Sequence, residues 1–129
     1  MKFNALIPEL SVSDIEKSIY FYIDVLGFKI EYERPENKFV FISLDGCQLM
    51  LEQINGNWSV GQLEYPFGRG MNLEMTVSDV DALYQRVLNH QVPVFRELTV
   101  HEYRENEETI LQKEFLVQDP DGYLLRFTC

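Results

Sequence analysis

The sequence is poor in the residues from which metal and redox centres are usually built. It contains only two histidines and two cysteines in 129 residues. Cys47 and Cys129 are too few and too unpatterned for a disulfide framework or a zinc ribbon. Cys47 has no histidine near it in the sequence, which gives little support for a thiol nucleophile. His90 and His101 fall at a predicted helix end and in a polar stretch.

Positive charge is scarce as well. Eleven basic residues stand against 21 acidic ones, for a formal charge of −10. Repulsion from phosphates then argues against nucleic acid and against anionic membranes as partners. The same charge suits a cationic ligand, although solubility alone would also explain it.

Long apolar runs are absent. No stretch approaches the ~20 apolar residues that a membrane-spanning helix needs. The first residues do not show a basic segment followed by an apolar one, so we expect no signal peptide and a cytoplasmic location. With 46% hydrophobic and 25% charged residues, the composition is that of a folded globular protein, one compact unit or two small halves sharing a core.

What the sequence does contain is an internal repeat. The stretch Leu10–Phe28 is echoed at Met75–Phe95, most closely where Val12-Ser13-Asp14-Ile15 matches Val77-Ser78-Asp79-Val80, 65 positions later. Each copy has alternating apolar residues, then a Ser-Asp pair of the kind that caps a helix, then apolar residues three or four apart. The shared order of strand, cap and helix favours duplication over chance.

The rest of each half continues the parallel, and both halves are predicted to have the order βαβββ. Asp45-Gly46 and Asp121-Gly122 provide hairpin signals at equivalent places. Residues 54–70 show neither period and are expected to connect the halves, and 101–108 form a polar stretch. We therefore predict an α+β fold of two tandem βαβββ modules, with module 1 at about 1–54, a linker at 55–70 and module 2 at 71–129. The predicted elements are strand 4–12, helix 14–26 and strands 28–32, 38–44 and 47–53, then strand 71–77, helix 79–89 and strands 94–99, 109–118 and 123–129.

Alternation along the strands predicts two different sheet faces. One face is apolar and should pack under the helices: Leu10, Val12, Leu49, Leu51, Leu73, Met75, Val77, Leu125 and Phe127. The other face is mixed: Ile7, Glu9, Ser11, Gln48, Met50, Glu52, Asn72, Glu74, Thr76, Leu124, Arg126 and Thr128. Such a face is solvated in many antiparallel sheets, and in a curved sheet it can line a cleft.

Several motifs resemble those of one superfamily. The Val-x-Asp-Ile/Val start of each half, FYIDVLGF at Phe21–Phe28 and DPDGYLLRF at Asp119–Phe127 are similar to the vicinal oxygen chelate superfamily, which includes glyoxalase I, extradiol dioxygenases, fosfomycin-resistance enzymes and bleomycin-resistance proteins. The resemblance covers nearly the whole chain and implies curved mixed sheets that form a cupped cavity, commonly within a dimer. GCQLMLE at Gly46–Glu52 most resembles the bleomycin-resistance branch.

The resemblance also says where a metal would be held. The four ligand positions of the enzymes fall here on Ile7, Met50, Asn72 and Arg126. An aliphatic side chain and a thioether are poor ligands for a hard or borderline divalent ion, and an arginine repels it. We therefore expect no metal, no cofactor and no catalytic residue. If Glu9, Glu52 and Glu74 converged, they would offer another way to hold a metal. Glu9 and Glu74 alone, at opposed places in the two modules, would suit a proton-shuttling pair.

Bleomycin-resistance proteins also lack the metal site and bind their drug without chemistry. The resemblance therefore implies a small, cationic and partly aromatic ligand, bound in a groove at or near the interface of a homodimer. Aromatic stacking surface would come from Tyr32, Phe39, Phe41, Trp58, Tyr65, Phe67 or Tyr103, although Phe39 and Phe41 also suit a core. The predicted ligand contacts are Glu9, Tyr32, Phe41, Met50, Glu52, Trp58, Asn72, Glu74 and Arg126.

Two other functions stay open at this point. One is a glyoxalase- or dioxygenase-like enzyme with an altered metal site, and the other is a structural or regulatory module with a vestigial cavity. The absence of suitable side chains at the metal positions favours a binding protein over an enzyme. The polar sheet face favours both of these over a structural or regulatory module.

Overall fold

A computed structural model describes all residues, 1–129, and contains two βαβββ units in sequence. This confirms the predicted α+β fold and its repeat. The first unit comprises β1 (Glu9–Val12), α1 (Ile15–Ile19) with its continuation η1 (Tyr20–Val25), β2 (Lys29–Arg34), the short turn η2 (Pro35–Asn37), β3 (Phe39–Leu44) and β4 (Cys47–Gln53). The second comprises β5 (Asn72–Thr76), α2 (Val80–Asn89), β6 (Val94–Glu105), β7 (Glu108–Gln118) and β8 (Leu124–Thr128).

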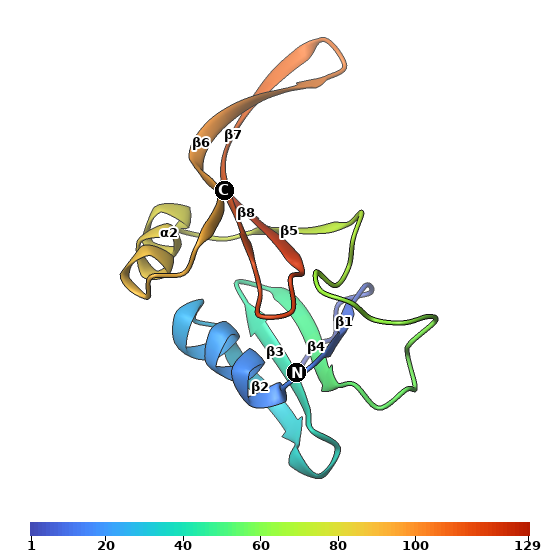
Figure 1. Ribbon diagram of the computed structural model, residues 1–129. Helices are drawn as coiled ribbons and strands as arrows, with labels where there is room; N and C mark the ends of the chain where they lie inside the picture. The colour runs from blue at the N-terminus through green and yellow to red at the C-terminus, as the bar shows by residue number, and fades with distance from the viewer.

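Each unit forms its own four-stranded mixed sheet (Figure 1). The strand order is β1-β4-β3-β2 in the first sheet and β5-β8-β7-β6 in the second. In both sheets the first and last strands of the unit pair in parallel, and the other neighbours are antiparallel. Leu10 pairs with Leu51 and Leu73 with Leu125, at equivalent places in the two sheets.

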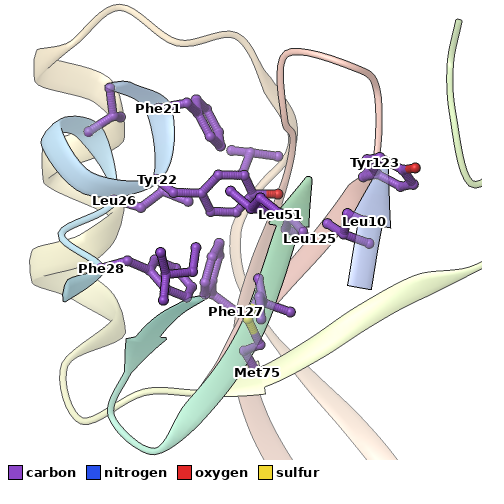
Figure 2. Packing of buried hydrophobic residues seen from close by; sticks show 14 of the residues in the cluster. Leu10, Phe21, Tyr22, Leu26, Phe28, Leu51, Met75, Tyr123, Leu125 and Phe127 are labelled. Atoms are coloured by element: carbon purple, nitrogen blue, oxygen red, sulfur yellow. The ribbon is translucent and has the colours of Figure 1, made fainter. Parts of the chain in front are cut away.

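The apolar faces of both sheets share one core with the helices (Figure 2). Leu10, Leu51, Leu125 and Phe127 are all buried in it, as the alternation of the sequence predicts. Tyr22 from the first helix lies among them without exposed surface. The two units therefore depend on each other for burial of their apolar surface.

The first helix differs from the prediction of one regular helix. Asp14 caps it by accepting from the backbone nitrogen of Glu16 at 3.0 Å, but after Ile19 the helix widens into a π-helix, η1. π-Helical turns are rare. The spacing of apolar residues does not reveal this one, because the same side of the helix stays buried through α1 and η1. None of the helices has the length and hydropathy needed to cross a membrane.

Reciprocal contacts join the two units at the motifs that reveal the repeat. Asp45, in the hairpin turn of the first unit, accepts from the backbone nitrogen of Ser78 at 2.9 Å. Asp121, in the equivalent turn of the second unit, accepts from the backbone nitrogen of Ser13 at 3.1 Å. Each Asp-Gly turn thus holds the strand-to-helix junction of the other unit.

The β6–β7 hairpin, here called the hairpin arm (Val94–Gln118), extends beyond the rest of the molecule (Figure 1). The prediction that strand 94–99 gives way to a polar stretch at 101–108 is wrong, because β6 continues to Glu105 and turns directly into β7. The outer part of the arm is exposed on both faces. Its strands therefore lack the alternation of apolar and polar residues from which a half-buried strand is predicted. The predicted strand at 4–12 is likewise shorter and begins at Glu9.

Candidate functional site

The polar face of the first sheet carries a row of predicted site residues. Strand pairing aligns Glu9 with Met50, Met50 with Phe41, and Phe41 with Tyr32. Paired residues of neighbouring strands point to the same face, so this row crosses the whole sheet. Alternation in the sequence predicts this face for Glu9 and Met50, and the strand pairing in the structure adds Phe41 and Tyr32 to it.

Two phenylalanine rings form the floor of this face. Phe41 is fully buried, with the Tyr32 ring stacked on it at 5.1 Å and the Phe3 ring edge-on at 5.4 Å. Phe39 is 2% exposed, and the guanidinium of Arg34 lies 4.0 Å above its ring. Tyr32 is partly exposed and Phe3 is 54% exposed, so these two rings cover Phe41 and present the open aromatic surface of this layer.

An acidic corner lies at the end of this face where β4 leaves the sheet; we define it by Glu9, Glu52, Asn55 and Trp58. Glu52 Oε1 accepts from Trp58 Nε1 at 3.2 Å and from Asn55 Nδ2 at 3.0 Å. Trp58 is 61% exposed, so one edge of its indole is held while its ring surface is open.

The carboxylates of the acidic corner have no positive partner in an ion pair. Partial burial raises the pKa of Glu9, the negative charge of Glu52 raises it further, and the charge of Arg34 lowers it. A pocket of about 500 Å³ opens beside Glu52, lined by Glu36, Asn37, Lys38, Glu52, Gln53, Ile54, Asn55 and Asn57. Two negative charges therefore lie close together, and Glu52 borders open space that Glu36 and Lys38 also line.

The polar face of the second sheet is organised differently, around a buried carboxylate. Glu114 on β7 is 3% exposed, and its Oε2 lies 2.6 Å from Arg126 Nε. Arg126 also contacts Glu74 Oε1 at 3.2 Å through Nη2, and Gln112 Nε2 donates to the same oxygen at 2.8 Å. Arg126 is thus a built-in cation between two carboxylates, and we call these residues with Tyr103 the Glu114 cluster.

Tyr103 and His101 complete the surroundings of Glu114. The hydroxyl of Tyr103 donates to Glu114 Oε1, and this bond, with burial, raises the pKa of Tyr103. His101 Nε2 lies 3.8 Å from Glu114 Oε1 and 2.7 Å from Thr99 Oγ1. Sequence reasoning missed Glu114. The available signal was a glutamate directly before the apolar run Phe115–Val117, where a lone charge needs a buried partner.

The remaining aromatic candidates are scattered. Phe67 is buried against Tyr123, with ring centres 5.8 Å apart, whereas Tyr65 is 62% exposed in the linker. Asn72 and Glu74 line a separate pocket of about 350 Å³ where β4 meets β5. That pocket is lined by Asn4, Leu6, Pro8, Cys47, Gln48, Leu49, Asn72, Leu73, Glu74 and Met75.

The residues at the metal positions implied by the resemblance do not fit a metal ion. Ile7 has no donor atom, Met50 lies in the row beside Glu9, and Arg126 is engaged with two carboxylates. No group of three or more His, Cys, Asp or Glu side chains is arranged to hold a metal. Glu9 and Glu52 lie together, but Glu74 belongs to the Glu114 cluster.

Comparison with known proteins gives a consistent family. The sequence model of the Glyoxalase/Bleomycin resistance protein/Dioxygenase superfamily matches residues 4–127. A lactoylglutathione lyase of Haemophilus influenzae is 31% identical over 123 residues, covering 92% of this chain and 86% of that protein. A solved structure of a superfamily member from Vibrio splendidus 12B01 is 41% identical over 93% of this chain and 92% of that chain, with a TM-score of 0.43. TioX from Micromonospora sp. ML1 is 18% identical and shares the fold, with a TM-score of 0.75 over 98% of both chains.

Proposed function

Because this chain belongs to the glyoxalase/bleomycin resistance protein/dioxygenase superfamily, we propose that it binds a small, cationic and partly aromatic ligand without metal chemistry, as bleomycin-resistance proteins do. The observation that carries the proposal is the acidic corner. Glu9 and Glu52 have no ion-pair partner there, and they lie next to an exposed indole.

The corner offers two kinds of attraction to such a ligand. Two adjacent carboxylates attract a cationic group, and the open ring of Trp58 offers a surface for a flat ring or for a cation. Both oxygens of the buried Glu114 face positive or donor groups of the protein itself, so the second sheet has less free negative charge to offer. Charge recognition is therefore assigned to the acidic corner, with Tyr32 and Met50 as the neighbouring apolar surface.

The test is a titration with bleomycin at several salt concentrations. Emission of Trp58, the single tryptophan, follows binding to the wild type, and calorimetry measures variants that lack it. Glu52→Gln should weaken binding most at low salt, because salt screens charges over ~8 Å at physiological ionic strength. Trp58→Ala should cost on the order of 1 kcal/mol at every salt concentration.

Asp24→Asn is the matched control, since it also removes one carboxylate charge, at an exposed position of η1 outside the acidic corner and the hairpin arm. An equal effect of Asp24→Asn and Glu52→Gln would mean that net charge, not the acidic corner, attracts the ligand. Failure of any such compound to bind at ~1 mM, which corresponds to about 4 kcal/mol, would end the drug-binding proposal.

The alternative is a glyoxalase- or dioxygenase-like enzyme with an altered metal site. It is favoured by the Glu114 cluster, where a buried carboxylate lies beside an imidazole and a phenol, groups suited to proton transfer. Elemental analysis separates the two proposals. We expect no stoichiometric zinc, nickel, manganese or iron in the purified protein, because Ile7 and Arg126 stand at the ligand positions. About one metal per chain that survives chelation would put the enzyme first.

A further inference from the structure

The loop that follows β4 contains the dipeptide Asn55-Gly56. Of the seven asparagines in the chain, Asn55 is the one followed by glycine. It is exposed, and its side chain belongs to the acidic corner, where it donates to Glu52 at 3.0 Å. An asparagine before a glycine is chemically the most vulnerable kind, because no side chain shields the next backbone nitrogen.

We propose that Asn55 is a site of spontaneous deamidation that adds a third carboxylate to the acidic corner. The backbone nitrogen of Gly56, after losing its proton to solvent, attacks the side-chain carbonyl carbon of Asn55. The bond from that carbon to the side-chain nitrogen breaks, the nitrogen takes up a proton from solvent, and ammonia leaves. The resulting five-membered imide is opened by water at either carbonyl, which gives aspartate or isoaspartate. Water is the only co-reactant, and no oxidant or reductant is needed.

The structure leaves the attacking nitrogen free. The Gly56 nitrogen donates no hydrogen bond to any protein acceptor. Gly56 has a φ of +90°, and a Cβ placed on it would meet no atom within 4 Å. No hydrogen bond has to be broken before the nitrogen reacts, and open space surrounds it.

The loop also prepares the group that is attacked. Asn55 Oδ1 accepts from the backbone nitrogen of Asn57 at 2.9 Å. This bond draws electrons from the carbonyl carbon and would stabilise the oxyanion that forms on attack, as donors do in oxyanion holes. Glu52 accepts from the nitrogen that leaves and so holds the amide in one orientation.

Deamidation would change the acidic corner directly. The amide of Asn55 donates to Glu52, whereas a carboxylate can only accept and repels it. Glu52 would keep the indole of Trp58 as its donor, next to an additional negative charge. Where this consequence concerns a ligand it rests on the proposed function: the modified protein would attract a cation more strongly.

Peptide mass mapping tests the reaction without any ligand. After incubation in warm, mildly alkaline buffer, the peptide containing Asn55 should gain the mass difference between an NH2 and an OH group. Peptides containing Asn89 and Asn106, which are also exposed but precede histidine and glutamate, should keep their mass. Isomerisation at Asp45-Gly46 leaves the mass unchanged and is not confused with this result. Asn55→Gln should remove the product, because a six-membered imide closes far more slowly.

The control is the same protein unfolded in urea. If Asn55 reacts there but stays intact in the folded protein, the fold protects it and the proposal is wrong. If Asn55 reacts only as fast as Asn89 and Asn106, the role assigned to Gly56 is wrong.

The electrostatic consequence has its own readout in Trp58 emission. Asn55→Asp should shift it relative to the wild type, and incubated wild-type protein should move toward that value while Asn55→Gln stays constant. Unchanged emission in Asn55→Asp would overturn the consequence. With bleomycin as probe, Asn55→Asp should bind on the order of fivefold more tightly at low salt, since one added charge contributes about 1 kcal/mol in water. If neither protein binds bleomycin, the proposed function fails, while the mass result still decides the modification.

Discussion

At the scale of the residue, Asp119 shows how burial and hydrogen bonding compete. Its carboxylate accepts from the Tyr22 hydroxyl at 2.7 Å and from the backbone nitrogens of Asp121 and Tyr123 at 2.9 and 3.0 Å. These bonds favour the charged form, but burial favours the neutral form more strongly and raises the pKa of Asp119 from 3.8 to about 6. The side chain therefore prefers a proton in the folded protein at mildly acidic pH.

The pH dependence of stability follows from this shift. Between pH 3.8 and about 6, the folded chain holds a proton on Asp119 that the unfolded chain has released, so its contribution to stability falls as pH rises. The contribution of Asp119 to stability is complete below pH 3.8 and is lost above about pH 6. The whole change amounts to about 3 kcal/mol. Asp119→Asn has the same shape and no charge, so the stability of the wild type relative to this variant should fall by that amount across the window.

Urea unfolding of both proteins at a series of pH values measures this difference. Because groups distant from Asp119 titrate equally in both chains, subtraction isolates Asp119 together with its neighbour Asp121, whose charge also raises the pKa of Asp119. If the stability of the wild type relative to Asp119→Asn rises with pH, the three hydrogen bonds outweigh burial and lower the pKa of Asp119 instead.

At the scale of the element, the hairpin turns do more than reverse the chain. Asp45 and Asp121 each accept from the backbone nitrogen of a serine at the start of a helix in the other unit. The two contacts are equivalent in the repeat but differ in environment, since Asp121 is 4% exposed and Asp45 is exposed. The repeat therefore provides one backbone contact in two environments, one buried and one exposed.

Asp121→Ala should destabilise the protein more than Asp45→Ala. Loss of Asp121 leaves the Ser13 nitrogen without an acceptor in a partly buried place, at a cost of about 1–3 kcal/mol. Loss of Asp45 also removes its bond from Ser78 Oγ at 3.1 Å and places alanine at a φ of +49°. Water can reach both donors of Ser78, so we expect roughly 1 kcal/mol. Urea unfolding followed by circular dichroism compares the two. Equal losses would show that both junctions are equally shielded from water.

At the scale of the whole molecule, the hairpin arm leaves apolar side chains without a partner. Val100 and Leu111 are 60% and 64% exposed on the arm that extends from the body (Figure 1). Asn72 and Glu74 on the polar face of the second sheet are also exposed in a single chain. These features support the proposal of a homodimer, in which a second copy covers the arm and closes the ligand groove.

Sedimentation should therefore give twice the 15.2 kDa of one chain at micromolar protein concentration. Leu111→Lys should shift the equilibrium toward single chains, because it places a charge in the proposed contact. Leu88→Lys on α2 is the control, since Leu88 is 42% exposed on a different element. A single-chain mass for the wild type would contradict the dimer and leave the fold unaffected.

The sequence by itself determined the elements and their faces. Alternation at Leu10 and Val12, helical spacing after Asp14 and the Asp-Gly turns are local patterns, and local patterns specify which side of a strand or helix is buried. They therefore predict two βαβββ units with one apolar and one polar face. The same patterns could not reveal η1, because the π-helix keeps the apolar spacing of the helix. They could not reveal the length of the hairpin arm either, because its outer part is exposed on both faces and shows no apolar alternation. The division at about residues 54 and 71 stays a prediction.

The tertiary structure alone decided which polar residues meet. Tyr22 and Asp119 are 97 positions apart, and Arg126 reaches Glu74 across 52 positions. Whether a glutamate such as Glu74 is free or paired depends on these distant neighbours. Periodicity carries no information about them, because it describes one element at a time. Only the packing of the two units and the pairing of their strands could show that Arg126 pairs with both Glu74 and Glu114, while Glu9 and Glu52 have no ion-pair partner.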